Sequence, residues 1–177
     1  MKNLHLILLF IGTALVSCDN QTSLQEYYVE NQENKQFLAI DIPASLLTGD
    51  NTALDAEQKA TLETIKKINL LGYPLNDKNK GSFEEEKEKL TAILQDQKYQ
   101  TLMKYGGGNR SAQLYYLGEE DAIDELIVFG SDEERGFGIA RVLGDDMDPE
   151  ALIKLFRSFE KGDVNIQGLQ ELISLKN

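Results

Sequence analysis

The segment YQTLMKYGGGNRSAQLYYLGEEDAIDELIVFGSDEERGFGIARVL, residues 99–143, determines the fold class of this 177-residue chain. It contains four runs rich in aromatic and aliphatic residues, namely YQTLMKY, SAQLYYL, DELIVFG and GFGIARVL. Short polar or glycine-rich pieces separate these runs: GGGNR, GEEDAI and SDEER. Strands joined by connections this short pair as consecutive antiparallel hairpins. The segment therefore predicts a four-stranded meander.

Before this segment, predicted strands alternate with predicted helices. Residues 37–43, FLAIDIP, and residues 68–75, INLLGYPL, are short apolar runs bounded by proline, which is typical of strands. Residues 53–67 and residues 82–94 instead carry apolar side chains at helical spacing. The first half of the domain therefore predicts two strand–helix pieces ahead of the meander.

Residue types also mark the predicted helix ends. Ser82 and Glu85 form a predicted capping box at the start of the second helix. Asp148 and Pro149 open a third helix, because aspartate is a favoured N-cap and proline a favoured first residue. Gly162 ends that helix, and the residues after it predict a short extended piece and a last helix or turn. These patterns predict a single α+β domain: a mixed, mostly antiparallel sheet of about five or six strands with helices packed on one face.

The N-terminus has the features of an export signal. Lys2 precedes an apolar run from Leu4 to Val16, and a small residue, Ser17, comes directly before Cys18. The run is shorter than the about 20 residues that a membrane-spanning helix needs. Residues 15–18, Leu-Val-Ser-Cys, resemble the lipobox of bacterial lipoproteins. The resemblance implies that Cys18 is acylated as the first mature residue and anchors the chain to the cell envelope, at its periplasmic face or outer membrane.

These features divide the chain into three predicted parts. Residues 1–17 are the lipoprotein signal peptide, residues 18–34 are the lipidated cysteine and a flexible tether, and residues 35–177 are the domain. The tether contains a small aromatic island, Tyr27-Tyr28-Val29, which we expect to dock on the chain's own domain.

Composition excludes several functions. The net charge of −12 repels nucleic acid, so we expect no nucleic-acid partner. The single histidine, His5, lies in the signal, and Cys18 is the single cysteine. A mature chain with no histidine and no free cysteine has no Ser-His-Asp triad, no Cys-His nucleophile, no zinc site of the usual type and no disulfide. We therefore expect a noncatalytic protein without a cofactor.

One acidic segment, GDDMDPE at residues 144–150, gathers hard oxygen ligands. Asp145, Asp146, Asp148 and Glu150 are the side-chain types that Ca²⁺ prefers, although the spacing of an EF-hand is missing. The same segment is also typical of a strand exit followed by a helix cap. We favour the cap, and a weak cation site remains the alternative.

Three segments, FLAIDIPASLL, DELIVFG and RVLGDDMDPEAL, together with the lipobox, are similar to a family of uncharacterised Gram-negative lipoproteins known only as a domain of unknown function. The resemblance covers residues 37–157 and implies a small exported α+β lipoprotein. It implies no activity and no site residue.

The function predicted from the sequence is that of a noncatalytic binding or accessory module in the cell envelope, with a lipid anchor in the membrane and an envelope protein as partner. The alternatives are a carboxylate-dependent envelope hydrolase and a weak divalent-cation-binding module. A hydrolase requires two carboxylates in one pocket, at least one with a raised pKa. A binding module requires an exposed apolar patch or an open sheet edge.

Overall fold

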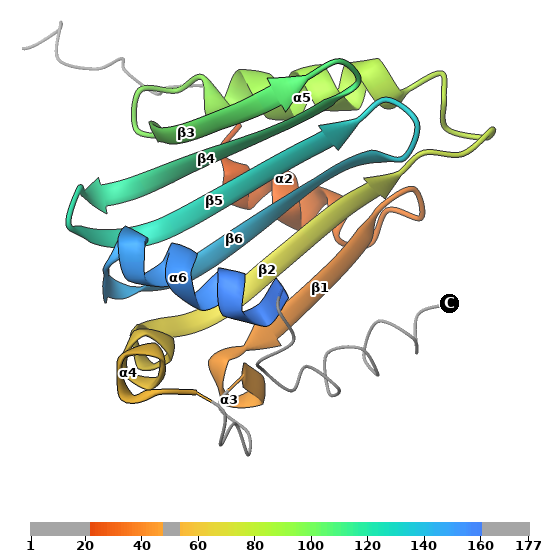
Figure 1. The fold of residues 1–177 in the computed structure, drawn as a ribbon. Helices are drawn as coiled ribbons and strands as arrows, with labels where there is room; N and C mark the ends of the chain where they lie inside the picture. The colour runs from red at the N-terminus through yellow and green to blue at the C-terminus, as the bar shows by residue number, and fades with distance from the viewer. Residues whose placement is uncertain (1–21, 48–53, 161–177) are drawn as a thin grey trace, which may run out of the picture.

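The computed structural model describes residues 22–47 and 54–160, and they form an α+β domain around a six-stranded antiparallel sheet (Figure 1). The strands are β1 (Leu38–Pro43), β2 (Ile65–Pro74), β3 (Gln100–Gly107), β4 (Arg110–Glu119), β5 (Ala122–Asp132) and β6 (Gly136–Met147). The helices are α2 (Leu24–Asn31), α3 (Ala44–Leu47), α4 (Ala56–Thr64), α5 (Phe83–Leu94) and α6 (Pro149–Glu160). The predicted fold class is confirmed.

The strand order is β1-β2-β6-β5-β4-β3, so the last four strands form the predicted meander. Each neighbouring pair is antiparallel, which makes the described sheet antiparallel throughout rather than mixed. The β3–β4 hairpin turns at Gly108 and Asn109 between the paired residues Gly107 and Arg110. Gly108 has a φ of 63°, a conformation that glycine adopts without steric cost. The glycine cluster is thus a hairpin tip, as its two flanking strands predict.

Helices cover both faces of the sheet, and the prediction of helices on one face is wrong. In Figure 1, α6 crosses in front of the strands and α2 lies behind them. One core cluster joins side chains of α2 and α5 to one face, including Leu24, Leu90 and Phe137. The second cluster joins α4 and α6 to the other face, including Leu62 and Leu155. The sheet therefore lies between two layers, and its inner strands are apolar on both faces.

The N-terminal helix α2 corrects the predicted tether. Residues 24–31 form a helix whose first turn has a capping box: Ser23 Oγ accepts from the Glu26 amide at 3.1 Å, and the Glu26 carboxylate accepts from the Ser23 amide at 2.7 Å. Tyr27 and Tyr28 are buried in the core beside α5 and β1. The expected docking of the aromatic island is confirmed, but the domain begins before residue 35.

The predicted capping box at Ser82 also needs correction. Ser82 makes no cap hydrogen bond; its hydroxyl instead lies 2.8 Å from the Tyr73 hydroxyl at the start of α5. On β4, Tyr115 and Tyr116 point to opposite faces, and both are buried because each face has its own core cluster. The extended piece and last helix predicted after Gly162 lie outside the described residues.

Candidate functional site

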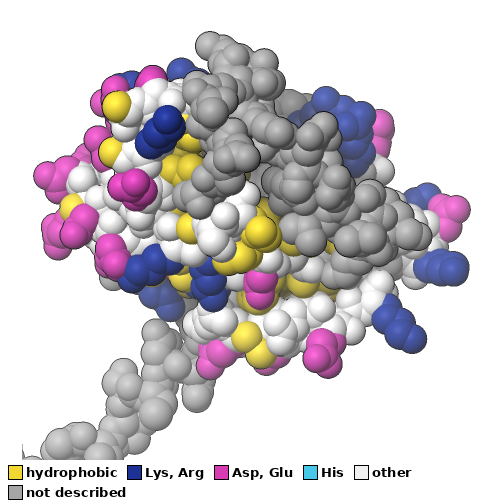
Figure 2. Space-filling view, turned by 90° about the horizontal axis from the view of Figure 1, so that it is seen from below, with side chains coloured by type: hydrophobic (Ala, Val, Ile, Leu, Met, Phe, Trp, Pro, Cys, Tyr) yellow, Lys and Arg dark blue, Asp and Glu magenta, His cyan; other side chains and the backbone are white. Residues whose placement is uncertain are grey.

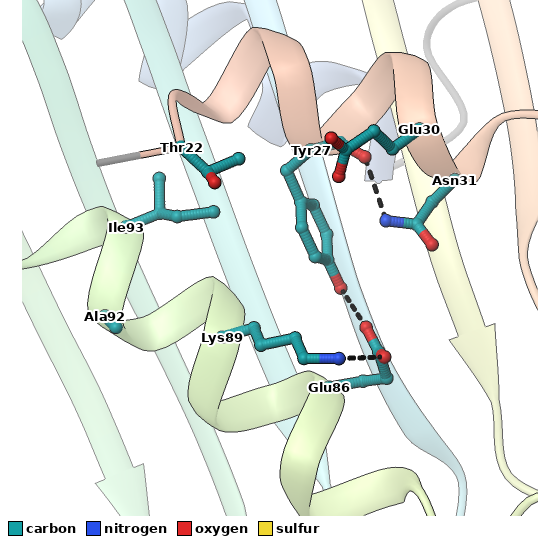
Figure 3. Close-up of a pocket in the computed structure, with 8 residues that line it drawn as sticks. All are labelled: Thr22, Tyr27, Glu30, Asn31, Glu86, Lys89, Ala92 and Ile93. Atoms are coloured by element: carbon teal, nitrogen blue, oxygen red, sulfur yellow. Dashed lines mark hydrogen bonds and ion pairs between the residues drawn. The ribbon is translucent and has the colours of Figure 1, made fainter. Parts of the chain in front are cut away.

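A polar pocket of about 520 Å³ lies between α2 and α5 (Figure 3). The Tyr27 hydroxyl points from α2 toward Glu86 of α5 and donates to its carboxylate at 3.2 Å. Lys89 donates to the same carboxylate at 2.9 Å. Burial, and then the Glu86 charge, raise the pKa of Tyr27 above its ordinary range. Hydrogen bonds to Glu85 and Glu86 raise the pKa of Lys89. The polar side chains of Tyr27, Glu86 and Lys89 hydrogen-bond to one another, and these bonds connect α2 to α5.

A row of polar residues, buried at Arg141, Glu125 and Asn69, runs beneath α2 and crosses four strands. Arg141 on β6 forms a two-pronged ion pair with Glu125 on β5, at 2.5 and 3.2 Å. Gln25 of α2 accepts from the third arm of the guanidinium at 2.6 Å.

The same row continues across β2 to β1. Asp41 on β1 accepts hydrogen bonds from Asn69 on β2 and, at 2.8 Å, from the Tyr28 hydroxyl. Burial and the Asp41 hydrogen bond raise the pKa of Tyr28. Every carboxylate in the row has a partner, and the row orients α2 on the sheet.

The acidic segment, residues 144–150, spans the end of β6 and the start of α6, and its side chains make independent contacts. Asp145 pairs with Lys66 on β2, and Glu150 pairs with Lys154 one turn along α6 at 3.1 Å. Asp146, next to the last residue of β6, has a φ of 47°. Asp148 accepts from the amides of Glu150 and Ala151 at 2.8 and 3.1 Å, so the predicted N-cap is confirmed. Over residues 22–47 and 54–160, no three His, Cys, Asp or Glu side chains lie close enough together to hold a metal ion.

Asp148→Ala is expected to destabilise the domain by about 0.5 to 2 kcal/mol, because the amides at the start of α6 lose their acceptor. Asp145→Ala removes only an exposed ion pair and is expected to cost less than about 1 kcal/mol. Urea unfolding followed by circular dichroism measures both changes. Calcium is expected to leave the melting temperature of the unsubstituted domain unchanged, and a calcium-dependent rise that Asp145→Ala abolishes would establish the cation site instead.

An apolar groove of about 500 Å³ lies on the other face of the sheet, beside α6. The groove is lined by apolar side chains from all six strands, α3 and α6, and by one arginine, Arg157 of α6. The strand residues include Leu70, Leu114 and Val128. The adjoining edge strand β3 pairs only with β4 in the described part of the chain. Its Met103 and Tyr105 are 45% and 75% exposed. Seen from below (Figure 2), hydrophobic side chains also show between charged ones at the end of the molecule formed by α3 and α4.

Carboxyl groups give little support to acid–base catalysis. Within the described ranges, each carboxyl group whose pKa departs from its ordinary value has a lowered pKa, held down by backbone amides or by a lysine. These groups are Glu26, Asp77, Glu85, Asp96 and Asp132. A general acid at neutral pH requires the opposite shift. The side chains that converge in the groove are apolar, which suits binding.

Comparison with known proteins places the domain in a family. A family model described as Domain of unknown function (DUF4252) matches residues 27–155, well over half of the chain. The chain belongs to this family. The DUF4252 match begins in α2 and ends in α6, so it includes the whole sheet and, apart from Leu24, both core clusters. No curated protein and no solved structure matches the chain. The family match indicates no activity.

The remaining predicted site residue, Cys18, lies outside the described residues, so acylation stays a prediction. None of the helices that the structure describes has the length and hydropathy needed to cross a membrane. The sequence interpretation missed the Arg141–Glu125 pair and the groove. The one sequence signal for the groove was the presence of apolar residues at consecutive strand positions, as in LIV at residues 126–128. Such a run indicates a sheet with two apolar faces.

Proposed function

We propose that this chain is a lipoprotein of the bacterial cell envelope whose domain is a noncatalytic binding module. Cys18 carries the lipid anchor, and an envelope component binds to the apolar face of the sheet between α6 and the β3 edge. The observation that carries the binding role is the apolar groove beside α6, which continues to the exposed side chains of β3. Exposed apolar surface of this kind marks binding sites in soluble domains.

The proposal favours binding over the hydrolase alternative for a chemical reason. A carboxylate-dependent hydrolase needs an acid with a raised pKa beside a second carboxylate in a concave site. In the polar pocket, Glu86 is instead committed to Tyr27 and Lys89. The cation-binding alternative has the ligand set Asp145, Asp146, Asp148 and Glu150, whose contacts with Lys66, the α6 amides and Lys154 favour structural roles.

The anchor is tested by growing cells that express the full-length chain with radiolabelled palmitate. Label is expected to stay with the protein through denaturing electrophoresis, because the acyl chains are covalently attached. Cys18→Ala is expected to remove the label and leave the longer precursor. Ser17→Ala, which keeps a small residue before the cysteine, is the matched control and is expected to label normally. Label that persists in Cys18→Ala would refute the lipoprotein assignment.

A further inference from the structure

The exposed part of the floor of the groove beside α6 is one row of side chains that crosses the sheet, next to a second row of buried side chains, Ile42, Ile68, Val142 and Leu126. The register places Leu70 opposite Ala140, Ala140 opposite Val128, Val128 opposite Leu114, and Leu114 opposite Met103. Each residue belongs to a different strand, in the order β2, β6, β5, β4 and β3. All five side chains are apolar and at least partly exposed. The floor is therefore a continuous apolar track running across the strands.

The dimensions of this track favour one narrow, unbranched chain. Four strand spacings of about 4.8 Å give the row a length of about 19 Å. A volume of about 500 Å³ spread over that length corresponds to a mean cross-section of about 26 Å². An α-helix with its side chains is about 10 to 12 Å wide, which is a cross-section of about 80 to 110 Å². A helix in this open groove would therefore stand mostly outside it, whereas an extended hydrocarbon chain fits within it.

The polar group on the wall of the groove is a cation. Arg157 projects from α6 beside Ile153 and Phe156, and its side chain is exposed. No ion pair holds Arg157 within residues 22–47 and 54–160, although acidic residues outnumber basic ones by 30 to 18 in the chain. A guanidinium binds a carboxylate through two parallel hydrogen bonds. The groove thus combines an apolar track with a site for an anionic head.

We propose that this groove binds one long-chain fatty acid. Its hydrocarbon chain lies along the row from Leu70 to Met103, and its carboxylate contacts Arg157. The proposal rests on the binding function proposed above and names the ligand class of the same surface. A domain tethered to a membrane is also placed where such ligands are available.

Titration calorimetry with laurate, a 12-carbon fatty acid, tests the proposal. The protein is the mature chain, residues 18–177, carrying Cys18→Ser so that no covalent lipid competes. Both core clusters lie between Leu24 and Leu155, so removing residues 1–17 removes no described contact. Saturable binding of one laurate per chain is expected. Each methylene removed is expected to weaken binding about fourfold, so decanoate binds about 16-fold more weakly.

Two variants separate the head-group contact from the hydrocarbon contact. Arg157→Gln is expected to weaken laurate binding about tenfold and to leave or strengthen binding of dodecyltrimethylammonium, which has the same chain with a cationic head. Arg135→Gln is the matched control, because Arg135 is an exposed arginine that does not line this groove; it is expected to change neither. Ala140→Phe fills the middle of the floor and is expected to weaken both ligands, with thermal melting used to verify that it folds.

Several outcomes would overturn the proposal. The proposal is wrong if laurate shows no saturable binding, or if Arg157→Gln leaves the affinity for laurate unchanged. Laurate binding that occurs only after residues 161–177 are deleted would assign the groove to that segment of the chain. A dimer in sedimentation that Ala140→Phe dissociates would assign it to a second copy. Failure of the laurate titration with palmitate labelling of Cys18 intact would refute the ligand and leave the anchor standing.

Discussion

Gly136→Ala is expected to destabilise the domain by about 4 kcal/mol or more, because neither the backbone conformation nor the surroundings of Gly136 admit a side chain. Gly136 starts β6 with a φ of 115°, in a region that other residues rarely adopt. A Cβ atom there would lie 1.9 Å from the Tyr73 carbonyl oxygen and 2.8 Å from the Leu75 nitrogen. Both neighbours are backbone atoms of the segment where β2 ends, so relief requires the strands to separate.

Urea unfolding monitored by circular dichroism measures this effect, with Gly81→Ala as the matched control. Gly81 lies in a polar turn, and no heavy atom lies within 4 Å of the position that an alanine Cβ would take there. Its substitution is therefore expected to change the unfolding free energy by less than about 1 kcal/mol. Equal losses in the two variants would show that the β2–β6 contact does not constrain Gly136.

The second large effect concerns the buried ion pair on the α2 side of the sheet. Arg141→Met is expected to cost about 3 to 5 kcal/mol, because it leaves the Glu125 carboxylate buried without a counter-ion. The two residues are 5% and 8% exposed, and α2 covers them through Gln25.

A double variant distinguishes the missing charge partner from lost packing. Arg141→Met with Glu125→Leu replaces both charges by apolar side chains and is expected to recover most of the stability, because no buried charge remains. Lys66→Met, which breaks an ion pair whose side chains are 62% and 66% exposed, is expected to cost less than about 1 kcal/mol. A single Arg141→Met variant as stable as Lys66→Met would contradict the account of the pair.

The strands could be predicted because their signals are local. The runs DELIVFG and GFGIARVL each carry enough apolar residues, between short polar turns, to specify β5 and β6. Helix α6 was predictable for the same reason, since Asp148 and Pro149 mark its start. Helix α2 was missed because its eight residues are too few to show a sustained apolar period, and the Ser23–Glu26 capping box was its one local signal.

The groove and the ion pair depend on contacts that no local pattern specifies. Arg141 meets Glu125 because the β5–β6 register sets Ile127 opposite Arg141, which makes Glu125 a diagonal neighbour although it is 16 positions away in the chain. Likewise, Val128 and Leu114 belong to one apolar row only through the β4–β5 register. Sequence periodicity predicts which residues of one strand lie on the same face. It does not predict which strands are neighbours in the sheet, or which part of a face a helix leaves uncovered.

Binding of an envelope component to the apolar face beside α6 is tested most directly by site-specific photo-cross-linking in growing cells. A benzophenone amino acid at Leu114 lies in the groove, whereas the same residue at Gln113 points to the opposite face of the same strand. We expect the variant with the photoreactive residue at position 114 to form an adduct of defined added mass, and the variant at position 113 to form none. Adducts at both positions, or at neither, would contradict binding at this face.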